Sequence, residues 1–178
     1  MNISVFCGAA MPENKHFVEA AREVGEIIAK EGHTLLYGGS NLGLMGIVSQ
    51  AVLDAKGIVF GVIPTFFPDE IIFSQRVTEL FRVKTIADRK TFMMDNSDVF
   101  LALPGGIGTL DELLEVMVAN QLNRISKPVG LLNIDGFFNP LIDMMRHMQY
   151  EGLFKLDKAN YLHIAATPGE LMRMLAVG

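Results

Sequence analysis

The stretch LPGGIGTLDE, residues 103–112, combines residues that can bind an anion with residues that can do acid–base chemistry. It carries three closely spaced glycines directly before a predicted helix, Gly105, Gly106 and Gly108. Glycine lets backbone amides approach an anion closely, and the first turn of a helix adds unpaired N–H groups and the positive end of the helix dipole. Asp111 and Glu112 then supply carboxylates, which can act as acid or base or stabilise positive charge. The stretch therefore suits a phosphate with chemistry beside it.

The same residues also have a purely structural interpretation. Thr109 followed three residues later by Glu112 matches a capping box, which predicts a helix that begins at Thr109 and ends at Leu122. Asp111 in a first turn favours the helix dipole. Glycine-rich turns also occur wherever a strand folds back tightly into a helix. Local sequence therefore leaves helix capping and catalysis open for Glu112.

Two more predicted strands end in small, flexible residues. The first strand is followed by CGAA, which contains Gly8, and the second by GGSNLG, which contains Gly39, Asn41 and Gly43. None of these loops matches the P-loop pattern, because no lysine follows the glycines, and the dinucleotide pattern GxGxxG is absent. Each loop is either part of a phosphate site or a tight turn between a strand and a helix.

The elements that must position these loops alternate between short apolar runs and longer helical patterns. The predicted strands are 3–7, 34–39, 58–64, 79–85, 99–104, 128–133 and 160–165. The predicted helices are 12–30, 44–56, 88–96, 109–122, 140–150 and 168–175. Apolar strands that are each followed by a helix indicate an α/β fold, with a parallel sheet and helices on both faces. Ligands bind beyond the carboxyl ends of such strands, which is where the glycine loops lie.

Three local details of this arrangement can be predicted. Pro12 suits the first turn of the first helix. The segment TFFPDEIIF, residues 65–73, is apolar but interrupted by Pro68, which is typical of a lid or surface turn. In the helix after the opening motif, the spacing predicts a core stripe and places Asn120 and Gln121 on an exposed or interface side. The members of that predicted stripe are Leu110, Leu113, Leu114, Met117 and Val118.

Composition limits the classes of protein to consider. The 178 residues fit one domain, 1–178. Half are apolar, 11 are methionine and the mean hydropathy is +0.32, which fits either a buried subunit interface or a well-filled core. A net charge of −5 argues against a nucleic-acid partner. The single cysteine, Cys7, together with the lack of a leader or a long apolar run, predicts a cytoplasmic protein without membrane attachment.

At this point the motifs resemble a known family. PGGIGTLDE matches the PGGxGTxxE motif of the lonely-guy phosphoribohydrolases, which were once labelled lysine decarboxylase-like. Asp88-Arg89-Lys90 resembles their upstream RK element, YGGSNLGLMG resembles their GGxxxGLMG loop, and KPVGLLNIDGFF resembles the segment that follows the motif helix. The resemblance covers most of the chain.

The resemblance implies a fold, a reaction and a set of site residues. It implies a Rossmann-like, three-layer fold, a homodimer, and an enzyme that needs neither metal nor cofactor. The expected reaction is hydrolysis of the N-glycosidic bond of a nucleoside 5′-monophosphate, such as a cytokinin riboside monophosphate or AMP, to the free base and ribose 5-phosphate. Arg89 and Glu112 would form the catalytic pair. The candidate substrate- and phosphate-binding residues are Gly8, Gly39, Asn41, Gly43, Lys90, Gly105, Gly106, Gly108 and Thr109.

The sequence also departs from the family pattern at three places. Ala9-Ala10 stands where the family usually has serines, Ile86-Ala87 where it has Met-His, and the stretch 73–84 is unusual. These departures leave the accepted base open. They also keep an alternative, a nucleotide-binding sensor module that binds without turnover, beside the enzyme. A nucleic-acid-binding relative of the same fold is disfavoured by the acidic charge.

Overall fold

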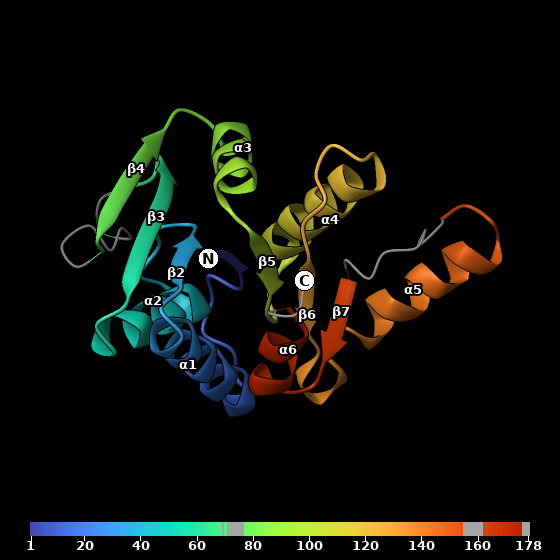
Figure 1. The fold of residues 1–178 in the computed structure, drawn as a ribbon, viewed down its shortest axis with the longest axis horizontal. Coiled ribbons are helices and arrows are strands. Elements are labelled where there is room, and N and C mark those ends of the chain that lie inside the picture. The colour runs from blue at the N-terminus through green and yellow to red at the C-terminus, as the bar shows by residue number, and fades with distance from the viewer. Residues whose placement is uncertain (69, 71–76, 155–161, 176–178) are drawn as a thin grey trace.

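The computed structural model describes residues 1–68, 70, 77–154 and 162–175, and it confirms the α/β fold. The described strands form one seven-stranded sheet in the order β4-β3-β2-β1-β5-β6-β7, in which every neighbouring pair is parallel (Figure 1). Their bounds are β1 (Asn2–Phe6), β2 (Thr34–Tyr37), β3 (Ile58–Pro64), β4 (Glu79–Val83), β5 (Val99–Ala102), β6 (Val129–Leu132) and β7 (Leu162–Ala165).

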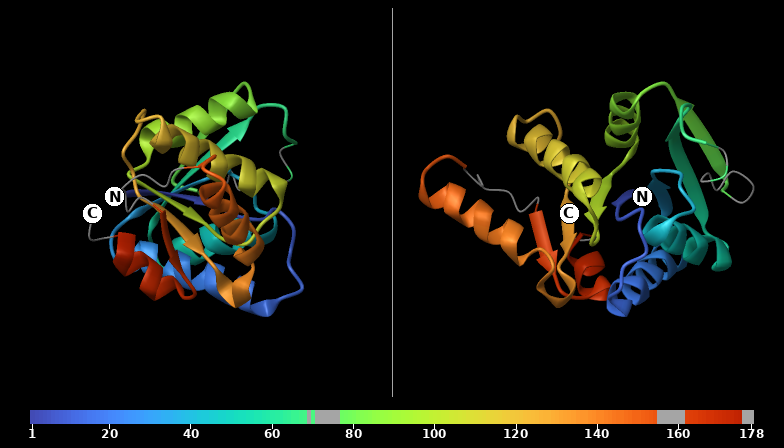
Figure 2. Two further views of the ribbon diagram at one scale, coloured as in Figure 1. Left: turned by 90° about the vertical axis from the view of Figure 1, so that its right-hand side faces the viewer. Right: turned by 180° about the vertical axis from the view of Figure 1, so that it is seen from behind.

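Helices cover both faces of the sheet and give three layers (Figure 2). The helices are α1 (Lys15–Lys30), α2 (Gly43–Asp54), α3 (Ile86–Asn96), α4 (Ile107–Gln121), α5 (Asn139–Tyr150) and α6 (Pro168–Leu175), with a short 3₁₀ turn, η2 (Ile134–Gly136). Side chains of α1, α2 and α6 form one buried cluster with the sheet, and those of α3, α4 and α5 form the other. The five inner strands are largely buried because helices cover both of their faces, which explains their nearly continuous apolar sequences. The edge strands β4 and β7 are only partly buried.

The order of the strands places the candidate site at the middle of the sheet. From the central pair β1 and β5 the chain builds outward in opposite directions, so the sheet has its topological switch point between these two strands. Gly8 follows β1 and Pro104 follows β5. The N–H of Gly8 donates to the carbonyl of Pro104 at 3.2 Å, so the two loops touch. A crevice at this point is the expected place for a ligand.

Three predicted helix starts are wrong by two or three residues. α3 begins at Ile86 rather than at residue 88, because Thr85 is its N-cap. α1 begins at Lys15 rather than at Pro12, because Asn14 is the N-cap and its side chain accepts the N–H of His16. α4 begins at Ile107, two residues before the predicted start at Thr109, with Gly106 as its N-cap. Thr109 is therefore inside the helix, and the predicted capping box does not form.

The buried face of α4 also differs from the predicted stripe. Leu113 and Met117 are buried as predicted, but Leu114 and Val118 are 42% and 50% exposed. Asn120, predicted to lie on an exposed or interface side, is buried. Its side chain accepts the N–H of Lys127 and donates to the Lys127 carbonyl, which stabilises the loop between α4 and β6. The buried face of α4 thus differs from the predicted apolar stripe, and it includes an amide whose hydrogen bonds are satisfied by loop backbone.

Parts of other predictions lie outside the described residues. The predicted lid covers 65–73, and of these residues 69 and 71–73 are not described. The described Phe66 and Phe67 stack in the turn after β3. Residues 160 and 161 of the last predicted strand are also outside the description. In the described ranges, no helix is both long and apolar enough to cross a lipid bilayer.

Candidate active site

A cavity of about 700 Å³ lies at the carboxyl edge of the sheet, where β1 and β5 diverge. Loops after β1, β2 and β5 form its walls together with α3, α4 and the turn after β6. Of the predicted site residues, seven line it: Gly8, Arg89, Gly105, Gly106, Gly108, Thr109 and Glu112. Four do not belong to the lining: Gly39, Asn41, Gly43 and Lys90.

The N-terminus of α4 opens into this cavity. Its N-cap is Gly106, which has no side chain to take up the N–H groups of the first turn, and those groups have no partner within the helix. Gly105 is required by packing, because a Cβ there would collide with Thr109 Oγ1 and would lie 2.8 Å from the Gly8 nitrogen. The helix dipole adds positive potential at the same point. The arrangement is suited to an anion such as phosphate.

Arg89 and Glu112 form an ion pair at the side of the cavity. The Nη2 of Arg89 donates to Oε1 of Glu112 at 2.7 Å, and the two side chains are only 14% and 11% exposed. A capping box of Thr85 and Asp88 begins α3 just before Arg89 and so fixes that residue in the first turns of the helix. Glu112 lies in the second turn of α4, too far along the helix to cap it. The capping role left open for Glu112 is therefore excluded.

Glu112 has an unusual electrostatic environment for a carboxylate. Burial raises the pKa of Glu112, the Arg89 guanidinium opposes that rise, and the neighbouring Asp111 adds to it. The guanidinium itself lies against the end of β2, where Nη1 would be 3.4 Å from a Cβ on Gly38. Among the described residues, the Nε of Arg89 has no hydrogen-bond partner. The pair thus places a carboxylate and a guanidinium at the wall of the cavity.

Cys7 also lines the cavity but is not poised as a nucleophile. Burial raises the pKa of its thiol far above neutrality, and the charge of Glu112 raises it further. The thiol therefore stays protonated at physiological pH, whereas nucleophilic cysteines need the thiolate.

The second glycine loop supports the first one. The N–H groups of Leu44 and Met45, at the N-terminus of α2, donate to the Gly8 carbonyl at 2.9 and 3.4 Å. Gly43 has φ +53°, and a Cβ there would lie 2.5 Å from the Ala10 carbonyl oxygen. This helix N-terminus therefore binds the backbone of the loop after β1. Sequence alone could not distinguish this use of helix N–H groups from anion binding.

An aromatic wall, made of Phe17 on α1 and Phe137 after β6, closes another side of the cavity. Their rings meet edge to face with centroids 5.4 Å apart. The sequence analysis did not single out either residue, because they are 120 positions apart and only the fold brings them together. The one local signal was the pair Phe137-Phe138 directly after a predicted strand.

An ion pair on the surface joins the two segments that carry the aromatic wall. His16 Nδ1 lies 2.8 Å from Asp135 Oδ2, which also accepts from Asn14 Nδ2 at 2.8 Å. These hydrogen bonds lower the pKa of Asp135, and the Asp135 carboxylate raises the pKa of His16. Asp135 has φ +51°, so the turn that presents Phe137 is a left-handed one.

No group of three or more histidine, cysteine, aspartate or glutamate side chains is placed to hold a metal ion within the described ranges.

Comparison with known proteins gives consistent relatives. The family model described as "Possible lysine decarboxylase" matches residues 45–175. The chain is 43% identical over 174 residues to a probable cytokinin riboside 5′-monophosphate phosphoribohydrolase of Oryza sativa subsp. japonica, covering 97% of this chain and 71% of the relative. It is 41% identical over 174 residues to a cytokinin riboside 5′-monophosphate phosphoribohydrolase of Arabidopsis thaliana, covering 97% and 80%.

A solved structure supports the fold. The molybdenum cofactor binding protein of Rippkaea orientalis aligns with a TM-score of 0.73 at 27% identity, covering 99% of this chain and 95% of that one.

Proposed function

Because the chain belongs to the lonely-guy family of phosphoribohydrolases, we propose that it hydrolyses the N-glycosidic bond of a nucleoside 5′-monophosphate. The products are the free base and ribose 5-phosphate. The observation that supports this reaction most directly is the buried Arg89–Glu112 pair beside the open N-terminus of α4. One part of the cavity suits the phosphate, and the adjacent part suits the bond to be broken.

The phosphate binds to the N-terminus of α4, at Gly105, Gly106, Gly108 and Thr109, with Gly8 beside it. Gly43 acts indirectly, because the start of α2 holds the loop that carries Gly8. Gly39 packs against β3 and Asn41 donates to the Glu70 carbonyl, so these two residues shape the neighbouring loop after β2. Binding energy from the phosphate, which is remote from the reacting carbon, then positions the ribose for the reaction.

Glu112 acts on the anomeric carbon. As the C–N bond breaks, its electron pair moves to the base nitrogen and positive charge develops on the ribose, which the carboxylate stabilises. The oxygen of a water molecule forms the new bond to the anomeric carbon. The water loses one proton, and the departing base gains one, so the protons balance. Arg89 opposes the rise that burial causes in the pKa of Glu112 and so favours the ionised carboxylate. The guanidinium also lines the cavity, where it binds the substrate.

The base lies against the apolar part of the cavity. Phe17, Phe67 and Phe137 line it together with Met45, which suits the face of a purine and an apolar substituent on it. The relatives in rice and Arabidopsis are named for cytokinin riboside monophosphates, and the proposal extends that substrate class to this chain. The same names, all of enzymes, disfavour the non-catalytic sensor.

The proposed enzyme is a cytoplasmic homodimer that acts on free nucleotides rather than on nucleic acid. Its net charge of −5 opposes binding to a polyanion. Leu114, Val118 and Leu122 leave an exposed apolar stripe along α4, and such a stripe suits a subunit interface. Sedimentation equilibrium should give twice the chain mass, and Val118→Glu should shift the equilibrium to monomer.

The function is tested by incubation with a panel of nucleotides that includes AMP, isopentenyl-AMP and their dephosphorylated nucleosides. We expect release of free base from at least one monophosphate and much less from its nucleoside. Glu112→Gln should abolish release and leave the fold, measured by circular dichroism, intact. Tight binding of a monophosphate without cleavage would instead favour the sensor. Full activity in Glu112→Gln would remove Glu112 from the mechanism.

A further inference from the structure

Lys90 follows Arg89 on α3 but its ammonium group binds to α4 instead of lining the cavity. Its Nζ lies 3.0 and 3.2 Å from the two carboxylate oxygens of Asp111 and 2.7 Å from Oε2 of Glu115. The Lys90 side chain is only 18% exposed, so it is held in this position. Asp111 and Glu115 are four residues apart on one face of α4 and would repel each other without the cation between them.

Two adjacent residues of α3 therefore contact two adjacent residues of α4. Arg89 pairs with Glu112 at the cavity, and Lys90 pairs with Asp111 one residue before it. α3 and α4 lie on the same face of the sheet with their axes inclined to each other (Figure 1). The two ion pairs fix both the separation of the helices and their rotation at the level of the cavity.

We propose that Lys90 is a positioning residue, which forms a clamp with Asp111 and Glu115 that holds the Arg89–Glu112 pair in its reactive geometry. The resemblance to the family had implied that Lys90 binds the substrate or its phosphate. In the role proposed here it does not bind phosphate. The predicted effect of the clamp on turnover rests on the proposed hydrolysis. Its predicted effect on the pKa of Glu112 does not, because that pKa can be measured without substrate.

The charges of the clamp act on Glu112 directly. The groups that face Glu112 are Arg89 and Lys90 from α3, Asp111 from its own helix, and the protonated Cys7 thiol at the end of β1. The two cations lower the pKa of Glu112, and Asp111 raises it. The contacts of Lys90 with the carboxylates of Glu115 and Asp111 raise its pKa, so the lysine stays charged at neutral pH. Loss of Lys90 should therefore raise the pKa of Glu112, and loss of the Asp111 charge should lower it.

The test compares Lys90→Gln, Asp111→Asn and Lys90→Arg with the wild type. For a substrate that the wild type hydrolyses, we expect Lys90→Gln to lower kcat by about 10- to 100-fold through misplacement of the pair, with KM within about twofold. The acidic limb of its pH–kcat profile should move to higher pH. In Asp111→Asn that limb should move to lower pH, and Lys90→Arg should restore most of the turnover. Arg146→Gln, which removes the exposed Arg146–Asp143 pair of α5, is the matched control and should change none of these values.

The outcomes separate the clamp from phosphate binding and from the proposed function. If Lys90 binds phosphate, Lys90→Gln will raise KM and the inhibition constant of ribose 5-phosphate at least tenfold with kcat retained, which overturns the clamp. If the acidic limbs of the pH–kcat profiles of Lys90→Gln and Asp111→Asn move in the same direction, the proposed clamp is also wrong. If the wild type cleaves no monophosphate, the proposed function fails, and NMR titration of the Glu112 carboxyl carbon in the same variants decides the clamp. Opposite pKa shifts in Lys90→Gln and Asp111→Asn support it, and equal or absent shifts refute it.

Discussion

Two ion pairs stand on different sides of the same cavity, and they have almost the same length. Arg89 and Glu112 approach to 2.7 Å and join α3 to α4. His16 and Asp135 approach to 2.8 Å and join the start of α1 to the turn after β6. The first pair has side chains 14% and 11% exposed, whereas those of the second are 66% and 48% exposed.

The difference in burial changes what each pair can do. Burial raises the pKa of Glu112 even though a guanidinium is in contact with it. In the exposed pair, the hydrogen bonds from Asn14 and His16 lower the pKa of Asp135, and the hydrogen bond and charge of Asp135 raise the pKa of His16. Because water is excluded around the buried pair, the electric field of its charges is only weakly screened. A strong field is what the stabilisation of charge in a transition state needs. An exposed pair adds little free energy and serves mainly to orient a turn.

Arg89→Met is the substitution with the largest expected effect. It removes the partner of a buried carboxylate, so we expect kcat to fall by about 10²- to 10³-fold or more and the free energy of unfolding to fall by about 3 kcal/mol at neutral pH. Without Arg89 the pKa of Glu112 in the folded state lies still further above its value in the unfolded chain. Stability is then highest at low pH and is lost as the pH rises through the folded-state pKa. Urea unfolding at pH 5 and pH 8 measures this.

The double variant Arg89→Met/Glu112→Gln is the control for that prediction. It removes both charges, so it should recover much of the stability that Arg89→Met loses. It should also lose the strong dependence of stability on pH that Arg89→Met shows, and it should recover none of the activity. An equal loss of stability at pH 5 and pH 8 in Arg89→Met would contradict the buried character of the pair.

The loop between the two sides of the cavity can be tested by a matched pair of glycines. Gly105→Ala places a Cβ against Thr109 and Gly8, and such overpacking should lower the free energy of unfolding by about 1 to 3 kcal/mol. At Gly106 a Cβ would meet no atom within 4 Å, and its φ of −91° suits alanine, so Gly106→Ala should unfold at nearly the wild-type urea concentration. Equal destabilisation by the two substitutions would show that the close contact is not what requires glycine.

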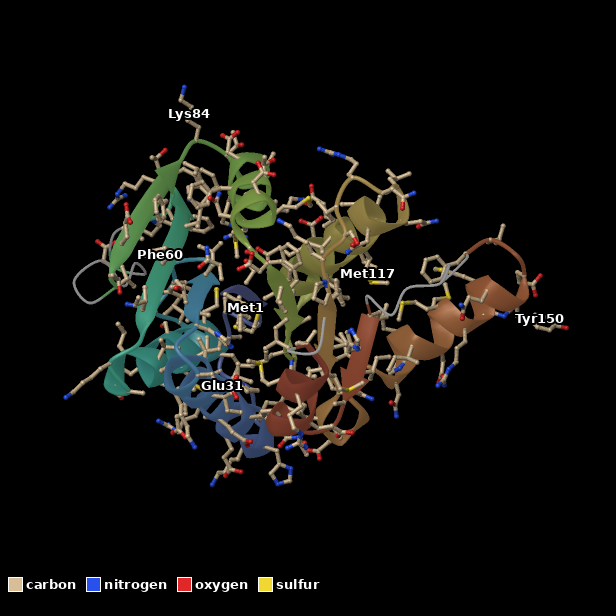
Figure 3. All side chains as sticks on the ribbon, viewed as in Figure 1. Met1, Glu31, Phe60, Lys84, Met117 and Tyr150 are labelled. Atoms are coloured by element: carbon tan, nitrogen blue, oxygen red, sulfur yellow. The ribbon has the colours of Figure 1, made fainter. Side chains whose placement is uncertain are left out.

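Phe137→Ala tests the aromatic wall, the counterpart of the buried ion pair. If a base lies against this ring, its loss should raise KM by about three- to tenfold, equivalent to the 0.5–1.5 kcal/mol of an aromatic contact, with a smaller change in kcat. Tyr150 lies at the end of α5 and is 86% exposed, away from the body of the protein (Figure 3). Tyr150→Ala is therefore the matched control. A fall in kcat at constant KM would instead assign Phe137 to the positioning of catalytic groups.

The fold could be predicted from the sequence because each buried strand is a short apolar run and each helix has its own period. Glycines after the first, second and fifth strands of the chain then located the carboxyl edge of the sheet. The start of α4 was wrong because Thr109 and Glu112 satisfy the spacing of a capping box, whereas the helix begins at a glycine with no capping side chain. A capping-box pattern shows that two side chains could accept the first N–H groups of a helix. It does not show that the helix begins at that position.

The site was less predictable than the fold because its details depend on contacts between distant residues. The pairing of Lys90 with Asp111 and Glu115 requires the relative rotation of two helices, and no spacing along the chain encodes it. The same holds for Phe17 with Phe137. The loop of Gly39 and Gly43 resembled an anion site, but the N–H groups of α2 bind the Gly8 carbonyl. Glycine spacing shows that backbone atoms approach closely but not what they approach.

The smallest expected effect is that of the surface pair, and pH reveals it. The raised pKa of His16 gives stability that is present below its unfolded-state value of about 6.5 and is lost as the pH rises through the folded-state pKa. The lowered pKa of Asp135 gives stability that is present above about 3.9 and is lost as the pH falls through its folded-state pKa. His16→Gln should therefore lower Tm most near pH 5 and hardly at all near pH 9. His147→Gln, at an exposed position of α5, is the matched control for the loss of a histidine. A loss of Tm that is independent of pH would mean that His16 stabilises the turn by packing alone, and the contrast between the buried and the exposed pair would no longer rest on charge.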